Sequence, residues 1–431
     1  MGTRRALLQA GLVLPLSACA PQLLWGDSAS IRIGVSWSGA ELAAFRKVLA
    51  PMPFARSVDV IPMGDEIGTA FSAGGKSAPD IVLLPQAGQV RTLVDAGKLR
   101  PVPDALWTDD QGARYPELWR QLLHHNGKPY GVPFKAADKS LVWYDRQAVD
   151  KYHLGDPADW TIADWGDRME VLAGTPIRLL ALAAADGWVL TDVFENVLRA
   201  ESPRTYDDLT TTAGEPRVWD RPAVRATFGH LARLWGRRHA IAGGVAVALT
   251  RQFPDAVRDV FEHRRAAMVI APDFAEPIVR ECLRDPGRQS EEVVGIAPFP
   301  VTGRGGERPR IVGGDVIVVT SGAGARADEV VAALAAAEAP LPWIQGDGGF
   351  IAPNTRTTVR YSALLEPIAR SQSPWSAFDL SDQLGAVGGR NGLWRILTDF
   401  LIAVGDGAAE RPDAAIDRAI AALDGFERSR R

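Results

Sequence analysis

The sequence has few of the residues on which cross-linked and metal-binding proteins depend. Only two cysteines, Cys19 and Cys282, occur among 431 residues. Cys19 lies in the N-terminal leader described below, so Cys282 is left alone, and one thiol cannot close an intramolecular disulfide. The six histidines show no spacing with cysteine that is typical of zinc sites. We therefore expect no disulfide framework, no metal and no cofactor.

Strong charge and catalytic motifs are missing as well. The net charge is −4, with both signs mixed along the chain, so nothing indicates a nucleic-acid partner. A Gly-x-Ser-x-Gly elbow, a Walker loop and a His-Glu-x-x-His motif do not occur. Carboxylates are numerous, but no motif singles out two of them as the catalytic pair that a glycoside hydrolase requires. The sequence therefore favours a protein that is not an enzyme.

The N-terminus does carry a distinctive pattern. Two arginines precede an apolar run over 6–16, and Leu-Ser-Ala-Cys follows at 16–19. The run is shorter than the roughly 20 residues that span a bilayer, which indicates a removable export signal. The motif resembles the lipobox of bacterial lipoproteins. It predicts a signal over 1–18, a lipid-bearing Cys19 and a linker over 19–30; the alternative is an ordinary signal with a chance cysteine.

The body of the chain alternates strand and helix patterns. Alternation over 31–37 and an apolar run over 80–85 predict strands, and apolar residues at helical spacing predict a helix over 41–49. Such alternation indicates a parallel sheet wrapped by helices, an α/β fold. The middle is richer in helix, strands return between 267 and 319, and the C-terminal region is mainly helical. Strand-rich blocks on both sides of a helical middle can arise when the chain crosses between two lobes.

Several separated strings, in order, resemble one family. They are APDIVLLPQAG at 78–88, KPYGVP at 128–133, SLVWYD at 140–145, DGWVLTDVFE at 186–195, GGD at 313–315, GGF at 348–350 and FDLSD at 378–382. The set resembles the solute-binding proteins of bacterial ABC sugar importers, of the maltose-binding type and within it the alpha-glucoside branch. Ala87 replaces the usual proline, and Val193 replaces the usual aromatic residue.

The resemblance implies an architecture. It implies a two-lobed periplasmic-binding-protein fold of type II, in which two α/β lobes are joined by hinge crossovers and the ligand lies in the cleft. Crossovers are expected near 132–138, 268–273 and 311–315. The implied division assigns 31–133 and 272–312 to the first lobe, and 138–268 and 315–431 to the second.

Candidate ligand-binding residues combine aromatic faces for sugar C–H groups with polar groups for hydroxyls. They lie where predicted strands end or in the shared motifs: Trp37, Glu41, Gln86, Lys135, Asp138, Trp188, Asp192, Phe274, Gly313, Gly314, Asp315, Phe350 and Arg356.

Each candidate has a plain structural alternative. Trp37 is the favoured platform because it ends the first strand, whereas Trp188 fits a core position equally well. Asp192 could cap a helix and Asp315 could hold the hinge. Other residues are expected to be structural, namely the core tryptophans Trp143, Trp219, Trp235 and Trp394 and the capping and turn residues Asp379 and Asp382.

The resemblance implies a lipid-anchored receptor outside the cytoplasm. It would act as a monomer that captures a glucoside or another di- or oligosaccharide and delivers it to the permease of an ABC importer. A secreted glycoside hydrolase, an adhesion lipoprotein and a binder of a glycerol phosphodiester remain the alternatives.

Overall fold

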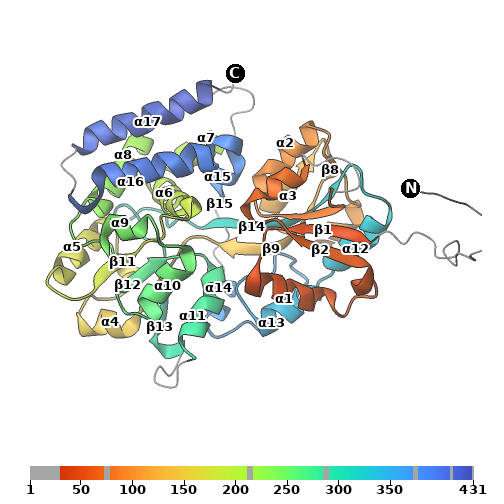
Figure 1. The fold of residues 1–431 in the computed structure, drawn as a ribbon, viewed down its shortest axis with the longest axis horizontal. Helices are drawn as coiled ribbons and strands as arrows, with labels where there is room; N and C mark the ends of the chain where they lie inside the picture. The colour runs from red at the N-terminus through yellow and green to blue at the C-terminus, as the bar shows by residue number, and fades with distance from the viewer. Residues whose placement is uncertain are drawn as a thin grey trace, which may run out of the picture.

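Two sheets, each covered by helices, form two lobes that are joined by long strands (Figure 1). The computed structural model describes residues 30–71, 78–210, 217–284, 291–371, 377–407 and 411–429. The predicted signal and Cys19, the predicted lipidation site, lie outside these ranges. None of the helices within them has the length and hydrophobicity that crossing a bilayer requires.

The first sheet is built around a parallel core. β1 (Ile31–Val35) lies between β2 (Val58–Pro62) and β3 (Ile81–Leu84) and is parallel to both. β3 is the predicted apolar run and is buried along its whole length, as a strand covered on both faces should be. β14 (Ile311–Thr320) pairs antiparallel with β3 and extends the sheet.

Short elements complete the first lobe. Strands β4 (Leu99–Arg100) and β15 (Ala377–Phe378) join β14, while two small hairpins stand apart, β5 (Thr108–Asp109) with β6 (Gly112–Ala113) and β7 (His124–His125) with β8 (Lys128–Pro129). The helices are α1 (Gly39–Leu49), α2 (Val90–Asp95), α3 (Glu117–Leu123), α12 (Arg326–Leu334) and α13 (Leu341–Gly346). Apolar side chains of α1 at helical spacing are buried against the sheet.

The second sheet has four strands in the order β11 (Arg178–Ala181), β12 (Ala266–Ile270), β10 (Leu141–Asp145) and β13 (Val294–Pro298). Its helices are α4 (Arg146–Lys151), α5 (Ile162–Leu172), α6 (Gly187–Glu201), α7 (Pro203–Thr210), α8 (Pro222–Trp235), α9 (Gly244–Ala248), α10 (Phe253–Phe261), α11 (Glu276–Cys282), α14 (Glu366–Ala369), α15 (Leu380–Gln383), α16 (Arg395–Val404) and α17 (Pro412–Arg428). α6 is buried along most of its length beneath α8 and α16.

Each lobe has its own hydrophobic core. The predicted core tryptophans Trp143, Trp219 and Trp235 are buried in the second core, which confirms that part of the expectation. Side chains of the first core come from residues 31–136 and 312–350, together with Phe378. The second core draws on residues 141–311 and on most of the chain after 350.

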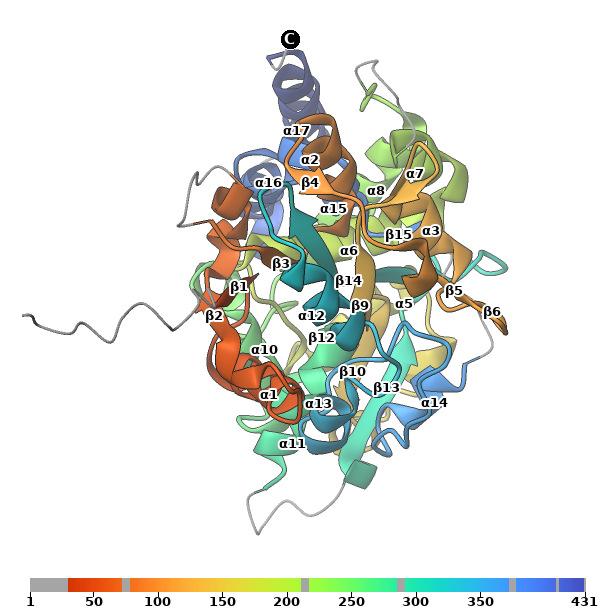
Figure 2. The same cartoon turned by 90° about the vertical axis from the view of Figure 1, so that its right-hand side faces the viewer.

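The crossovers divide the chain differently from the expected boundaries. β9 (Val132–Asp138) and β14 run side by side between the lobes, as Figure 2 shows, so the first and third expected crossovers lie in these strands. Residues 268–273 are not a crossover, because β12 and β13 both pair with β10 in the second sheet. Residues 272–311 therefore belong to the second lobe and 316–350 to the first, and the chain returns to the second core from Ile351.

Candidate functional site

A cleft of about 570 Å³ lies between the lobes where β9 and β14 connect them. Eight of the predicted ligand-binding residues line it, namely Trp37, Glu41, Gln86, Lys135, Trp188, Phe274, Gly314 and Asp315. Trp37 and Glu41 follow β1, and Gln86 follows β3. The carboxyl ends of parallel strands meet at one edge of a sheet, which is why these residues converge.

Trp37 forms part of the cleft wall but is largely a core residue. It is only 5% exposed, and its ring lies edge-on to Phe45 at 5.2 Å and to Trp343 at 4.9 Å. α1 supplies Phe45 and α13 supplies Trp343, so two helices cover the ring from behind. Trp37 is therefore a buried residue of the cleft wall and not the open platform that the sequence predicted.

Lys135 is enclosed by aromatic rings at the hinge. Its Nζ lies 5.1–5.8 Å from the ring centroids of Trp37, Phe274, Trp343 and Phe350. The same atom lies 2.6 Å from Glu41 Oε1. Burial alone would lower the pKa of Lys135, but the carboxylates around it outweigh burial and raise the pKa above its ordinary value.

Asp315 lies on β14 opposite Lys135 in the strand register. Burial raises the pKa of its carboxyl to about 7, although the charge of Lys135 and a hydrogen bond from Trp37 oppose the rise. The adjacent Gly314 has a φ of 141°, and a Cβ there would overlap the carbonyl oxygen of Lys135. Glycine at this position allows β9 and β14 to approach closely beside the cleft.

The second lobe supplies a more open aromatic wall. Trp188 is half-buried near the start of α6, with its ring centroid 5.1 Å from that of Phe253 and 5.7 Å from that of Phe274. Trp394 also lines the cleft and is half-buried, so its expected core position is wrong. A Cβ on Gly187 would lie 2.7 Å from the Cβ of Trp394, so glycine allows Trp394 to pack beside α6.

The Gly-rich segment before α16 contributes residues that the sequence reasoning missed. Gly388, Gly389, Arg390 and Asn391 line the cleft together with Trp394. Residues Arg390–Trp394 form a kinked turn in which Gly392 has a non-helical backbone conformation. The glycine spacing was the signal that could have identified this segment.

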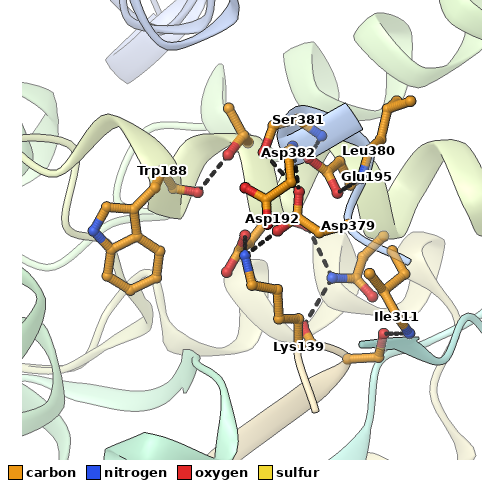
Figure 3. A network of polar contacts seen from close by, with 12 residues as sticks. Lys139, Trp188, Asp192, Glu195, Ile311, Asp379, Leu380, Ser381 and Asp382 are labelled. Carbon is orange, nitrogen blue, oxygen red and sulfur yellow. Dashed lines mark hydrogen bonds and ion pairs between the residues drawn. The ribbon is translucent and has the colours of Figure 1, made fainter. Parts of the chain in front are cut away.

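A buried ionic network forms the floor of the cleft (Figure 3). Lys139 Nζ lies 3.0 Å from Asp192 Oδ1 and also pairs with Asp379. Burial raises the pKa of Asp192 to about 7 even though Lys139 opposes the rise. For Asp379 the contacts with Lys139 and Ser381 outweigh burial and lower the pKa. Sequence reasoning missed Lys139 because its partners come from distant segments.

Glu195 of α6 holds the start of α15 in place through hydrogen bonds to its backbone. Its carboxylate accepts hydrogen bonds from the backbone N–H groups of Leu380 at 2.8 Å and Ser381 at 2.9 Å. The Tyr206 hydroxyl donates a third at 3.2 Å. Asp379 caps α15 by accepting from the N–H of Asp382, so its predicted capping role is confirmed.

Five predicted residues do not line the cleft, namely Asp138, Asp192, Gly313, Phe350 and Arg356. Asp138 pairs with Arg310 at 3.1 Å on the hinge. Asp192 lies within α6 and pairs with Lys139, so it does not cap that helix.

The other three predicted residues also make contacts away from the cleft lining. Gly313 is buried beside Lys139, whose Cε would lie 2.7 Å from an added Cβ. Phe350 is fully buried behind Lys135. Arg356 pairs with Asp109 of the small hairpin at 2.9 Å, in the first lobe.

The described side chains contain no group of three or more His, Cys, Asp or Glu placed to hold a metal ion. The cleft presents aromatic faces, amides, carboxyl groups, the exposed Arg390 and two lysines that are paired with carboxylates.

Known proteins of similar sequence or structure bind solutes. The chain is 26% identical over 389 residues to the osmoprotective compounds-binding protein GgtB of Synechocystis sp., covering 84% of this chain and 86% of that protein. It is 28% identical over 248 residues to the alpha-glucosides-binding periplasmic protein AglE of Rhizobium meliloti, covering 52% and 51%.

Solved structures share the fold. The solute receptor AcbH, described as having an exclusive preference for b-D-galactopyranose, matches with a TM-score of 0.72 and 16% identity over 93% of this chain and 98% of that one. A chitin oligosaccharide binding protein matches with a TM-score of 0.71 and 18% identity over 94% and 100%. These likenesses confirm the two-lobed fold, and the relatives are receptors rather than enzymes. The model of the bacterial extracellular solute-binding proteins matches residues 58–348, more than half of the chain, and the protein belongs to that family.

Proposed function

We propose that the protein captures a neutral carbohydrate in the cleft between its lobes and delivers it to the permease of an ABC importer. The observation that carries the proposal is the combination of aromatic and polar groups in one cleft. Trp188, Phe274 and Trp394 of the second lobe present aromatic faces, and Glu41 and Gln86 of the first lobe present polar groups. A sugar ring has both apolar C–H faces and hydroxyl groups, so it suits such a cleft.

The charges in the cleft favour a neutral ligand over a phosphodiester. Lys135 is paired with Glu41, and Lys139 is paired with Asp192 and Asp379. An anionic ligand would have to compete with these carboxylates for both lysines. The acidic surplus around the two lysines therefore argues against the phosphodiester alternative.

The relatives narrow the class of carbohydrate. One is named for osmoprotective compounds and another for alpha-glucosides. A glucoside or a small di- or oligosaccharide is consistent with both names and with a cleft of about 570 Å³.

The long strands between the lobes support a hinge mechanism. A ligand that touches both walls stabilises the closed arrangement by its differential affinity, so binding shifts the population of lobe positions. β9 and β14 would absorb the rotation, while each hydrophobic core moves as a unit. The closed, loaded receptor is then the form that docks on the permease, and we propose that it does so as a monomer.

A thermal-shift screen tests the proposed ligand class. The panel comprises methyl α-glucoside, maltose, trehalose, sucrose and raffinose, with glycerophosphocholine and a dipeptide as controls. A ligand at about 100 times its dissociation constant stabilises the folded protein by about 2.7 kcal/mol. Stabilisation by the phosphodiester or the peptide alone would contradict the proposal. Recovery of the bound saccharide unchanged after long incubation would separate a receptor from the hydrolase alternative.

We also propose that residues 1–18 are removed and that Cys19 carries the lipid anchor, with 19–30 as the linker. The support is the Leu-Ser-Ala-Cys motif directly after the short apolar run. Cys19→Ser should release the protein from the membrane fraction without changing ligand affinity. Wild-type protein that fractionates as soluble and begins at another residue would refute the anchor.

A further inference from the structure

The floor of the cleft holds more acid than its lysine can neutralise. Lys139 is shared by Asp192 and Asp379, which come from α6 and from the cap of α15. Asp382 lies one turn further along α15, beside the same network (Figure 3). Two carboxyl groups therefore already share one lysine before Asp382 is considered.

Asp382 itself faces the cleft. Its side chain is half-buried and lines the cavity, and within the described ranges no lysine or arginine pairs with it. Its backbone N–H donates a hydrogen bond to Asp379, and Asp382 is one of the residues that line the cleft.

The groups around Asp382 are mostly acidic. Three carboxyl groups disfavour ionisation of Asp382, namely Asp379 at the start of α15, Asp192 on α6 and Asp315 on β14. Among the largest electrostatic effects on Asp382, the charge of Lys139 is the one that favours its ionised form. Glu195 lies beneath α15, and Arg390 is exposed on the cleft wall formed by the Gly-rich segment. Burial is the largest effect, and together with the neighbouring carboxylates it raises the pKa of Asp382 well above its ordinary value.

We propose that Asp382 enters the cleft as a protonated carboxylic acid and donates a hydrogen bond to an acceptor oxygen of the bound carbohydrate. This inference rests on the proposed function. The ring and glycosidic oxygens of a saccharide have no proton, so they can only accept. An ionised carboxylate can only accept as well, whereas a carboxylic acid can donate. Asp382 thereby selects for an acceptor oxygen at this position of the ligand.

The inference has a pH dependence of defined sign. As the pH rises through the pKa of Asp382, the donor is lost and a negative charge faces the ligand oxygen, so affinity falls. Asp382→Asn keeps the size and a donating N–H but cannot ionise. The variant should therefore bind with little dependence on pH.

The experiment measures the affinity of the best-stabilised saccharide of the panel by calorimetry between about pH 6 and about pH 9. Wild type should weaken on the order of tenfold at the alkaline end, whereas Asp382→Asn should stay constant within about threefold. Asp109→Asn is the control, because this carboxyl group lies in the small hairpin outside the cleft and its loss should keep the wild-type profile. A profile that persists in Asp382→Asn and disappears in Asp315→Asn would overturn the proposal.

A ligand-free measurement separates this inference from the proposed function. Difference infrared spectra between unliganded wild type and Asp382→Asn, recorded as a pH series, should show a protonated carboxyl C=O band of Asp382 that persists above the pH at which an ordinary aspartate ionises. A carboxylate band in its place would refute the protonated state whatever the ligand. A protonated band combined with no binding by the saccharide panel would instead refute the proposed function, and with it the hydrogen bond to a carbohydrate.

Discussion

Replacing each of two cleft tryptophans by alanine should affect different properties. Trp37 is 5% exposed and packs edge-on between Phe45 and Trp343. Truncating a buried aromatic side chain costs about 3–5 kcal/mol of the free energy of unfolding, because it removes contacts and leaves a cavity. For a domain of this size that corresponds to a fall in melting temperature on the order of 10 °C.

Trp188 is half-buried, and part of its ring faces the ligand space. Its truncation removes a stacking face rather than a packed core group, so the unliganded protein should melt close to wild type. Ligand affinity should weaken by about 1–3 kcal/mol, which is about 5- to 150-fold. Trp188→Phe keeps an aromatic face and should lose less affinity than Trp188→Ala.

The assay combines the melting temperature of unliganded protein with calorimetric affinity for the same two alanine variants. The reasoning is refuted if Trp188→Ala melts as far below wild type as Trp37→Ala does. It is also refuted if Trp188→Ala binds the saccharide with unchanged affinity.

Three further predictions follow from particular contacts. Arg356→Ala should leave ligand affinity unchanged, because Arg356 lies outside the cleft. It should reduce the free energy of unfolding by at most about 1 kcal/mol, because the ion pair with Asp109 is partly exposed. A large loss of affinity in calorimetry would be inconsistent with this placement. Gly88→Val should weaken ligand binding, because a Cβ there would overlap the carbonyl oxygen of Asp382 across the lobes, and unchanged affinity would show that closure does not need this contact. The folded protein raises the pKa of Asp192 and of Asp315 to about 7, whereas in the unfolded chain both ionise near their ordinary pKa of 3.8. Their contribution to stability should therefore fall as the pH rises from about 4 to 7. Denaturant unfolding at several pH values should show a smaller fall in Asp192→Asn and Asp315→Asn than in wild type.

Sequence periodicity predicted the local elements, because burial on one face or both leaves a visible pattern. β3 is an uninterrupted apolar run, and α1 carries its apolar residues at helical spacing. The assignment of segments to lobes failed between 272 and 350, because it depends on which strand pairs with which. The pairing of β13 with β10 joins two segments that are far apart in the sequence, so no local pattern predicts it.

The candidate site was predictable where a residue directly follows a strand of the parallel sheet. Gln86 follows β3 and Glu41 lies in the first turn of the helix after β1, so both reach the cleft for that reason. The burial of Trp37 was not predictable, since Trp343 covers it from a helix about 300 positions along the chain. Lys139 and Asp382 acquire their roles only when α6, β14 and α15 are brought together.

The most direct test of the account is isothermal titration calorimetry of the purified protein with the saccharide panel and glycerophosphocholine. The account predicts binding of at least one saccharide at one molecule per chain, and no heat of binding for the phosphodiester. Binding of glycerophosphocholine while every saccharide is silent would contradict the central claim that the cleft is built for a neutral carbohydrate.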